Sequence, residues 1–156
     1  MATAEAIYVD PSALLKLYVH QRESRAMSAW RARVPGTLLV THHGRMEVVN
    51  GICLAAFRGD ISAEAMRDAL ASFEEDFAEG RYARADLLWR AALERARGLS
   101  AEYTPRLGCR SLDVLHVASA LELARKRFLT FDVRQQRLAT AVGLKPIVPG
   151  SASRAT

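Results

Sequence analysis

Short apolar segments that alternate with helical patterns are the feature that most constrains the fold of this chain. Residues 7–10, 37–41, 128–131 and 145–148 are the segments with strand-like composition. The segments between them are longer, and their apolar residues recur at helical spacing. Short apolar strands separated by helices are typical of parallel βαβ units whose sheet is covered on both faces. The sequence therefore predicts an α/β fold with a central, mainly parallel sheet.

Seven helices are expected around these strands. They cover residues 11–20, 23–33, 42–58, 62–78, 86–102, 111–127 and 133–142. A chain of 156 residues is long enough to form one domain that buries roughly two-thirds of its unfolded surface. We expect a single domain over residues 1–149 and a flexible tail over 150–156, where the sequence reads GSASRAT after Pro149.

Composition narrows the class of partner and the compartment. No apolar run approaches the ~20 residues that cross a bilayer, and the first residues lack the features of a signal peptide. Cys53 and Cys109 are too few for a disulfide framework or a metal cluster, so a cytoplasmic location is expected. The net charge of +5 weakly favours a polyanionic partner such as RNA, DNA or an acidic protein.

Three aspartates occupy positions where a strand ends or a helix begins. Asp10 and Asp132 each follow an apolar strand, and either could simply cap the helix that comes next. Asp113 falls in a first helical turn, where the helix dipole favours negative charge. Its helical face is otherwise small and apolar, so its carboxylate is expected to need a paired charge or a bound cation.

One glutamate joins this set. Glu47 lies on a helix that follows the second strand, and a solvent-exposed position is the simplest interpretation of it alone. Sites in open α/β sheets form outside the carboxyl ends of the strands, so the four acidic groups can meet at one edge. Clustered carboxylates need cations, and an oxygen-only ligand set suits Mg²⁺ or Mn²⁺. Such ions serve phosphodiester cleavage.

Four segments, in this order, resemble a known family. They are IYVDPSALLKLY (7–18), RMEVVNGI (45–52), CRSLDVLHVASAL (109–121) and FLTFDVRQQRLATAVGL (128–144). Together they resemble the PIN-domain proteins of the VapC type, which are the ribonuclease toxins of bacterial toxin–antitoxin pairs. The segment THHGR before Glu47 departs from the usual pattern of this family.

The resemblance implies a three-layer α/β/α sandwich and a Mg²⁺- or Mn²⁺-dependent endoribonuclease that cleaves RNA phosphodiester bonds with metal-activated water. It assigns the catalytic quartet to Asp10, Glu47, Asp113 and Asp132. The three aspartates bind metal, Asp132 directly or through water, while Glu47 orients the attacking water or holds a second ion. The expected partners are an RNA substrate and a cognate antitoxin protein, with a homodimer inside a larger toxin–antitoxin complex and no membrane.

Six further residues are candidates for supporting or RNA-binding roles. Ser12 and Thr130 are the small polar residues expected to support the ligands, and His116 is either a structural histidine near Asp113 or a base. Arg110 meets either a phosphate or a site carboxylate. Arg134 and Arg137 lie one turn apart, either guiding RNA or forming a solvated helix face.

Two other functions are compatible with parts of the pattern. The chain could be a catalytically inactive PIN-like module that binds RNA or protein, although the intact acidic quartet argues against it. A phosphohydrolase of the haloacid dehalogenase type also begins with a strand and an Asp. That chemistry needs a second Asp two residues further on, where this chain has Ser12.

Overall fold

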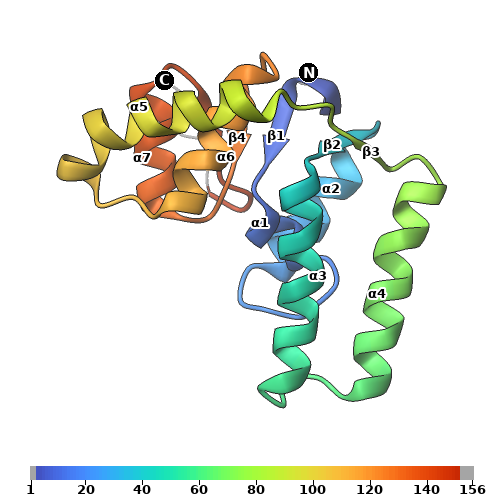
Figure 1. Cartoon of the computed structure of the whole chain (residues 1–156). Helices are drawn as coiled ribbons and strands as arrows, with labels where there is room; N and C mark the ends of the chain where they lie inside the picture. The colour runs from blue at the N-terminus through green and yellow to red at the C-terminus, as the bar shows by residue number, and fades with distance from the viewer. Residues whose placement is uncertain (1–2, 152–156) are drawn as a thin grey trace.

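The computed structural model describes residues 3–151, and a five-stranded sheet runs through the middle of them (Figure 1). The strands, in chain order, are β1 (Ile7–Val9), β2 (Leu38–Val40), β3 (Tyr82–Arg84), β4 (Arg127–Leu129) and β5 (Lys145–Ile147). Their order across the sheet is β3-β2-β1-β4-β5, and every neighbouring pair is parallel. The predicted parallel sheet is therefore confirmed.

The helices form one layer on each side of this sheet. A 3-10 turn, η1 (Ala4–Ala6), precedes β1, and the helices within residues 3–151 are α1 (Pro11–Leu15), α2 (Ser24–Arg33), α3 (His42–Phe57), α4 (Ala63–Ala78), α5 (Trp89–Leu107), α6 (Ser111–Glu122) and α7 (Val133–Ala141). Helices α1 to α4 lie on one side and α5 to α7 on the other (Figure 1).

Alternating side chains of the strands supply the two hydrophobic cores between these layers. Ile7 and Val9 of β1 pack in the core beneath α1 to α4, whereas Tyr8 packs in the core beneath α6 and α7. In β4 the same alternation places Leu129 in the first core and Phe128 in the second. The structure is thus the predicted three-layer α/β/α sandwich.

Several predicted boundaries are wrong for local reasons. The helix expected over 111–127 ends at Glu122, because Ala124 adopts a left-handed backbone with φ 52° before β4 begins. The helix expected over 86–102 spans Trp89–Leu107 and includes Pro105 in its last turn. The helix expected over 11–20 ends at Leu15. Strand β3, at one edge of the sheet, was not predicted at all.

Two expectations lie at the limits of the described chain. Most of the predicted flexible tail, residues 152–156, lies outside the described residues, so the tail remains a prediction. In the part of the chain that the structure covers, no helix is long and apolar enough to cross a membrane.

Candidate active site

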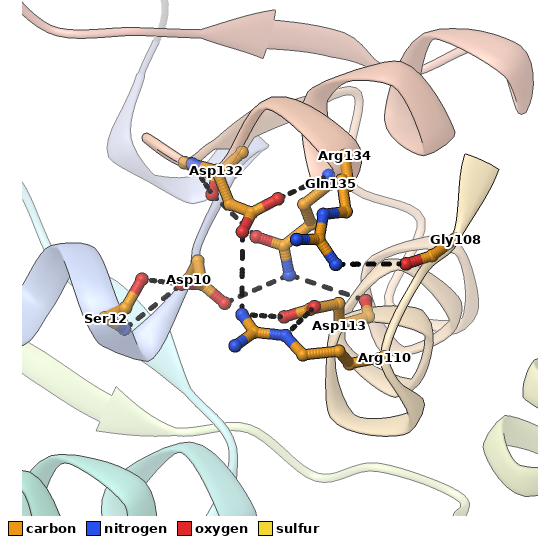
Figure 2. Close-up of polar contacts among 9 residues, drawn as sticks. Asp10, Ser12, Gly108, Arg110, Asp113, Asp132, Arg134 and Gln135 are labelled. Atoms are coloured by element: carbon orange, nitrogen blue, oxygen red, sulfur yellow. Dashed lines mark hydrogen bonds and ion pairs between the residues drawn. The ribbon is translucent and has the colours of Figure 1, made fainter.

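Asp10 and Asp132 cap the helices that follow two neighbouring parallel strands. Asp10 follows β1, and its Oδ2 accepts hydrogen bonds from the Ser12 backbone N–H, at 3.1 Å, and from the Ser12 hydroxyl. Asp132 comes shortly after β4, and its Oδ1 accepts from the backbone N–H of Gln135 at 3.0 Å. Because β1 and β4 are paired, the two capping carboxylates lie at the same edge of the sheet (Figure 2).

Asp113 reaches the same edge from the first turn of α6. The Asp113 side chain is 11% exposed, and the Arg110 guanidinium compensates its charge. Arg110 Nε donates to Asp113 Oδ2 at 2.8 Å, and Nη2 of the same side chain lies 3.5 Å from Asp132 Oδ2. Figure 2 shows the guanidinium between these two carboxylates. The sequence predicts a paired charge or a bound cation for Asp113, and the structure shows a paired charge, the guanidinium of Arg110.

Gln135 connects the carboxylates and is the residue that the sequence analysis missed. It is fully buried in α7, and its Nε2 donates to Asp10 Oδ1 at 3.1 Å and to the Asp113 carbonyl oxygen at 3.4 Å. Its Oε1 accepts from the Thr130 hydroxyl at 2.6 Å. Gln135 lies one helical turn before Leu138 and Ala139, both buried, and this spacing is the signal that could have identified it.

Burial and positive charge oppose each other at Asp10. Asp10 is 5% exposed, and this burial raises the pKa of its carboxyl group above the ordinary value. The nearby His116 and the hydrogen bonds from Ser12 and Gln135 act in the opposite direction. A cation placed beside Asp10 would therefore relieve an electrostatic cost that the fold imposes.

Glu47 lies near Asp10 and is joined to Tyr8 by two hydrogen bonds through His116. Glu47 projects from α3, on the opposite side of the sheet from α6 and α7, and its Oε2 is bonded to Nε2 of His116 in α6. Nδ1 of His116 lies 2.7 Å from the Tyr8 hydroxyl. A carboxylate oxygen accepts hydrogen bonds, so Nε2 of His116 is the donor to Glu47. His116 is 1% exposed, and its two ring nitrogens contact Tyr8 and Glu47.

His43 packs against His116, and its ring nitrogens have no hydrogen-bond partner among the described residues. Its ring stacks on His116 with centroids 4.6 Å apart, and Trp89 of α5 approaches it edge-on at 4.9 Å. Among the described residues, none makes a hydrogen bond with either ring nitrogen of His43. Burial, followed by the nearby His116 and His42, lowers the pKa of His43 to about 3. The ring is therefore neutral at physiological pH.

The remaining predicted residues lie at different distances from the carboxylates. Ser12 contacts Asp10 directly, and the Thr130 hydroxyl accepts from the Asp132 backbone N–H at 3.1 Å, so both have supporting contacts. Arg134 is exposed beside the site and donates to the Gly108 carbonyl at 3.3 Å (Figure 2). Arg137 is exposed one turn further along α7 and makes none of the contacts described above.

The side chains present suit a hard divalent cation. Within residues 3–151, no group of three or more acidic, cysteine or histidine side chains is already arranged to hold a metal ion. The site instead brings the Asp113 and Asp132 carboxylates to one organic cation, the Arg110 guanidinium, and Gln135 links Asp10 to the same group. Carboxylate oxygens are the ligands that Mg²⁺ and Mn²⁺ prefer, and the position of Arg110 shows that positive charge is favourable there. The donor set therefore fits such an ion.

Comparisons with known proteins agree with this geometry. The family model of the PIN domain matches residues 7–141, which is most of the chain and includes all four acidic residues of the predicted quartet. Ribonuclease VapC46 of Mycobacterium tuberculosis (strain ATCC 25618 / H37Rv) is 32% identical to this chain over 146 residues. That similarity covers 92% of this chain and 98% of the relative. The chain therefore belongs to the PIN-domain family, as a member of the VapC type.

Proposed function

We propose that this chain is a Mg²⁺- or Mn²⁺-dependent endoribonuclease that acts as the toxin of a toxin–antitoxin pair. The observation that carries the proposal is the meeting of Asp10, Asp113 and Asp132 at one edge of the sheet, where Asp113 and Asp132 share the Arg110 guanidinium and Gln135 bonds Asp10. Membership of the PIN-domain family and similarity to a ribonuclease support the same chemistry.

The four acidic residues divide between two proposed roles. Asp10, Asp113 and Asp132 would hold the cation, Asp132 directly or through water. The cation, when bound, supplies an activated water and stabilises negative charge on the scissile phosphate. Glu47 would orient the attacking water or hold a second ion. Its bond to His116 supports this role, because it fixes the carboxylate at a place where the charge of Glu47 raises the pKa of Asp10.

RNA would approach over the arginines around the carboxylates. The side chain of Arg110 is 69% exposed although its guanidinium contacts Asp113 and Asp132, so it can also meet a phosphate. Arg134 and Arg137 extend the positive charge along α7. Contacts with phosphates supply affinity without sequence preference, which leaves the choice of cleavage site to other surfaces.

The expected protein partners follow from membership of the VapC type. We propose a homodimer in the cytoplasm, joined by a cognate antitoxin into a larger complex that blocks cleavage. The assay is growth of bacteria that express the chain alone or together with the product of the adjacent gene. Growth arrest by the wild-type chain, relieved by the adjacent product, is the expected result. Unimpaired growth with accumulated, folded protein would count against a toxin.

The nuclease itself is tested with purified chain that is free of any antitoxin. A pool of tRNA, rRNA and mRNA is incubated with Mg²⁺, Mn²⁺ or EDTA, beside the variants Asp10→Asn and Asp60→Asn. Asp60 is exposed on the loop after α3, so its variant makes the same chemical change away from the site. Discrete metal-dependent fragments that Asp10→Asn alone abolishes are expected. Intact RNA with folded wild-type protein would favour the binding module.

A further inference from the structure

Gln135 is a fully buried polar side chain that lies between the carboxylates. Its Nε2 is 3.1 Å from Asp10 Oδ1 and 3.4 Å from the carbonyl oxygen of Asp113 (Figure 2). Its own backbone N–H donates to Asp132 Oδ1 at 3.0 Å. One residue therefore contacts all three segments that carry the aspartates.

Thr130 fixes which end of the Gln135 amide faces the carboxylates. The Thr130 hydroxyl oxygen accepts from the Asp132 backbone N–H at 3.1 Å, and its proton is directed to Gln135 Oε1 at 2.6 Å. With Oε1 facing a donor, Nε2 faces Asp10. The opposite orientation would place Oε1 against a carboxylate oxygen and a carbonyl oxygen, and neither of these groups can donate.

The two oxygens of Asp10 are consequently held by different partners. Oδ2 accepts from the backbone and hydroxyl of Ser12, and Oδ1 accepts from Gln135. A carboxylate bonded through both oxygens cannot rotate freely about its Cβ–Cγ bond. Each ionised oxygen offers about two acceptor directions, so the single bond from Gln135 leaves Oδ1 with one direction open.

We propose that Gln135 is a positioning residue that aims Asp10 Oδ1 at the space shared with Asp113 and Asp132 and so sets the affinity of the site for a divalent cation. This inference rests on the proposed function, because it concerns the cation of that same site. Partners of metal ligands often act in this way, and their loss typically weakens metal binding about 10- to 100-fold.

The direct test measures Mn²⁺ binding by the full-length chain, with no RNA present. Electron paramagnetic resonance of the free ion gives the Kd for the wild type and for Gln135→Met, which keeps the volume of the side chain and removes its amide. Gln136→Met is the matched control, since Gln136 is the next residue of α7 and, among the described residues, its side chain bonds only the Thr130 backbone carbonyl, at 3.4 Å. We expect Gln135→Met to raise the Kd about 10- to 100-fold and Gln136→Met to leave it unchanged.

A second pair of variants keeps Gln135 in place and tests the direction of its amide. Thr130→Val removes the hydroxyl that holds Oε1, whereas Thr130→Ser retains it. We expect Thr130→Val to weaken Mn²⁺ binding and Thr130→Ser to restore the wild-type Kd. The Thr130 hydroxyl also accepts from the Asp132 backbone N–H, so the double variant Gln135→Met/Thr130→Val is measured as well. If Thr130 acts through Gln135, the second substitution adds nothing to the effect of the first. If Gln135→Met does not fold, Gln135→Leu removes the same amide and takes its place.

The possible outcomes separate this inference from the proposed function. If the wild type binds Mn²⁺ and the folded Gln135→Met and Thr130→Val variants bind it equally well, Gln135 does not position Asp10. If the folded wild type does not bind Mn²⁺, the metal-dependent nuclease is wrong and this inference falls with it. Thermal melting of each variant in EDTA shows which of them are folded.

Discussion

His43 offers a sharp test of the structure, because it is a buried imidazole whose ring nitrogens have no partner among the described residues. Its pKa is lowered from 6.5 to about 3, chiefly by burial. In the unfolded chain the same ring takes up a proton near its ordinary pKa. Between pH 6.5 and about pH 3, the unfolded state therefore binds more protons than the folded state. The stability that His43 contributes is present above pH 6.5 and is lost as the pH falls toward 3.

The size of the effect follows from linkage. Between about pH 7 and about pH 5 the folded ring stays neutral while the unfolded ring becomes protonated. The corresponding loss in the free energy of unfolding is about 2 kcal/mol. His43→Phe keeps an aromatic ring against His116 and Trp89 but cannot titrate. The variant also removes two unsatisfied buried nitrogens, so we expect it to be as stable as the wild type, or more so, at neutral pH.

Urea unfolding of both proteins at the two pH values measures this difference. Other titrating groups contribute to both proteins, so their effects cancel when the pH dependence of the variant is subtracted from that of the wild type. We expect the wild type to lose about 2 kcal/mol more than His43→Phe on acidification. An equal loss in the two proteins would show that the His43 ring takes up protons in the folded state and would contradict its lowered pKa.

Three further predictions concern the helix end before β4, the Glu47 contact and the cation. Ala124→Gly should raise the free energy of unfolding, measured in urea, by about 0.5–1 kcal/mol. The reason is that φ is 52° at Ala124, and glycine adopts this conformation without strain. A loss of stability would contradict the left-handed backbone at this position. Glu47→Gln should melt within a few degrees of the wild type, since its amide oxygen can still accept from His116. The same variant should cleave RNA at least about tenfold more slowly, and full activity would remove Glu47 from the proposed mechanism. In EDTA, stability linked to Asp10 should fall as the pH rises above 3.8, because the raised pKa favours the protonated folded form. Mg²⁺ should therefore raise the Tm more at neutral pH than at pH 4 in the wild type and not at all in Asp10→Asn, whereas equal shifts in both proteins would place the ion elsewhere.

The sequence predicts the sheet and the strand-end aspartates because local patterns determine both. An apolar strand followed by Asp and a helical pattern, as at Asp10 and Asp132, specifies the strand end, the cap and the helix start together. Parallel pairing then places neighbouring strand ends at one edge of the sheet. The positions of these carboxylates are therefore a consequence of short-range signals.

Other features depend on contacts between distant parts of the chain. Strand β3 is an edge strand of three residues in which Tyr82 is buried but Arg84 is exposed, so it lacks an apolar run. Helical spacing places Gln135 on the buried face of α7, but only the packed structure shows that its amide meets Asp10. The bond between Glu47 and His116 joins the two helical layers, and local spacing contains no information about such a contact.

The strand order has a consequence for the synthesis of the protein. Strand β1 lies in the middle of the sheet, where Tyr8 pairs with Leu39 on one side and with Phe128, near the end of the chain, on the other. The half of the sheet formed by β1, β2 and β3 can pair while the rest of the chain is still on the ribosome, because domains emerge from their N-terminal end. Asp10 is then in place before Asp113 and Asp132 are synthesised, because these two residues belong to α6 and to the segment after β4. A nascent chain therefore carries no assembled acidic site until its translation is almost complete.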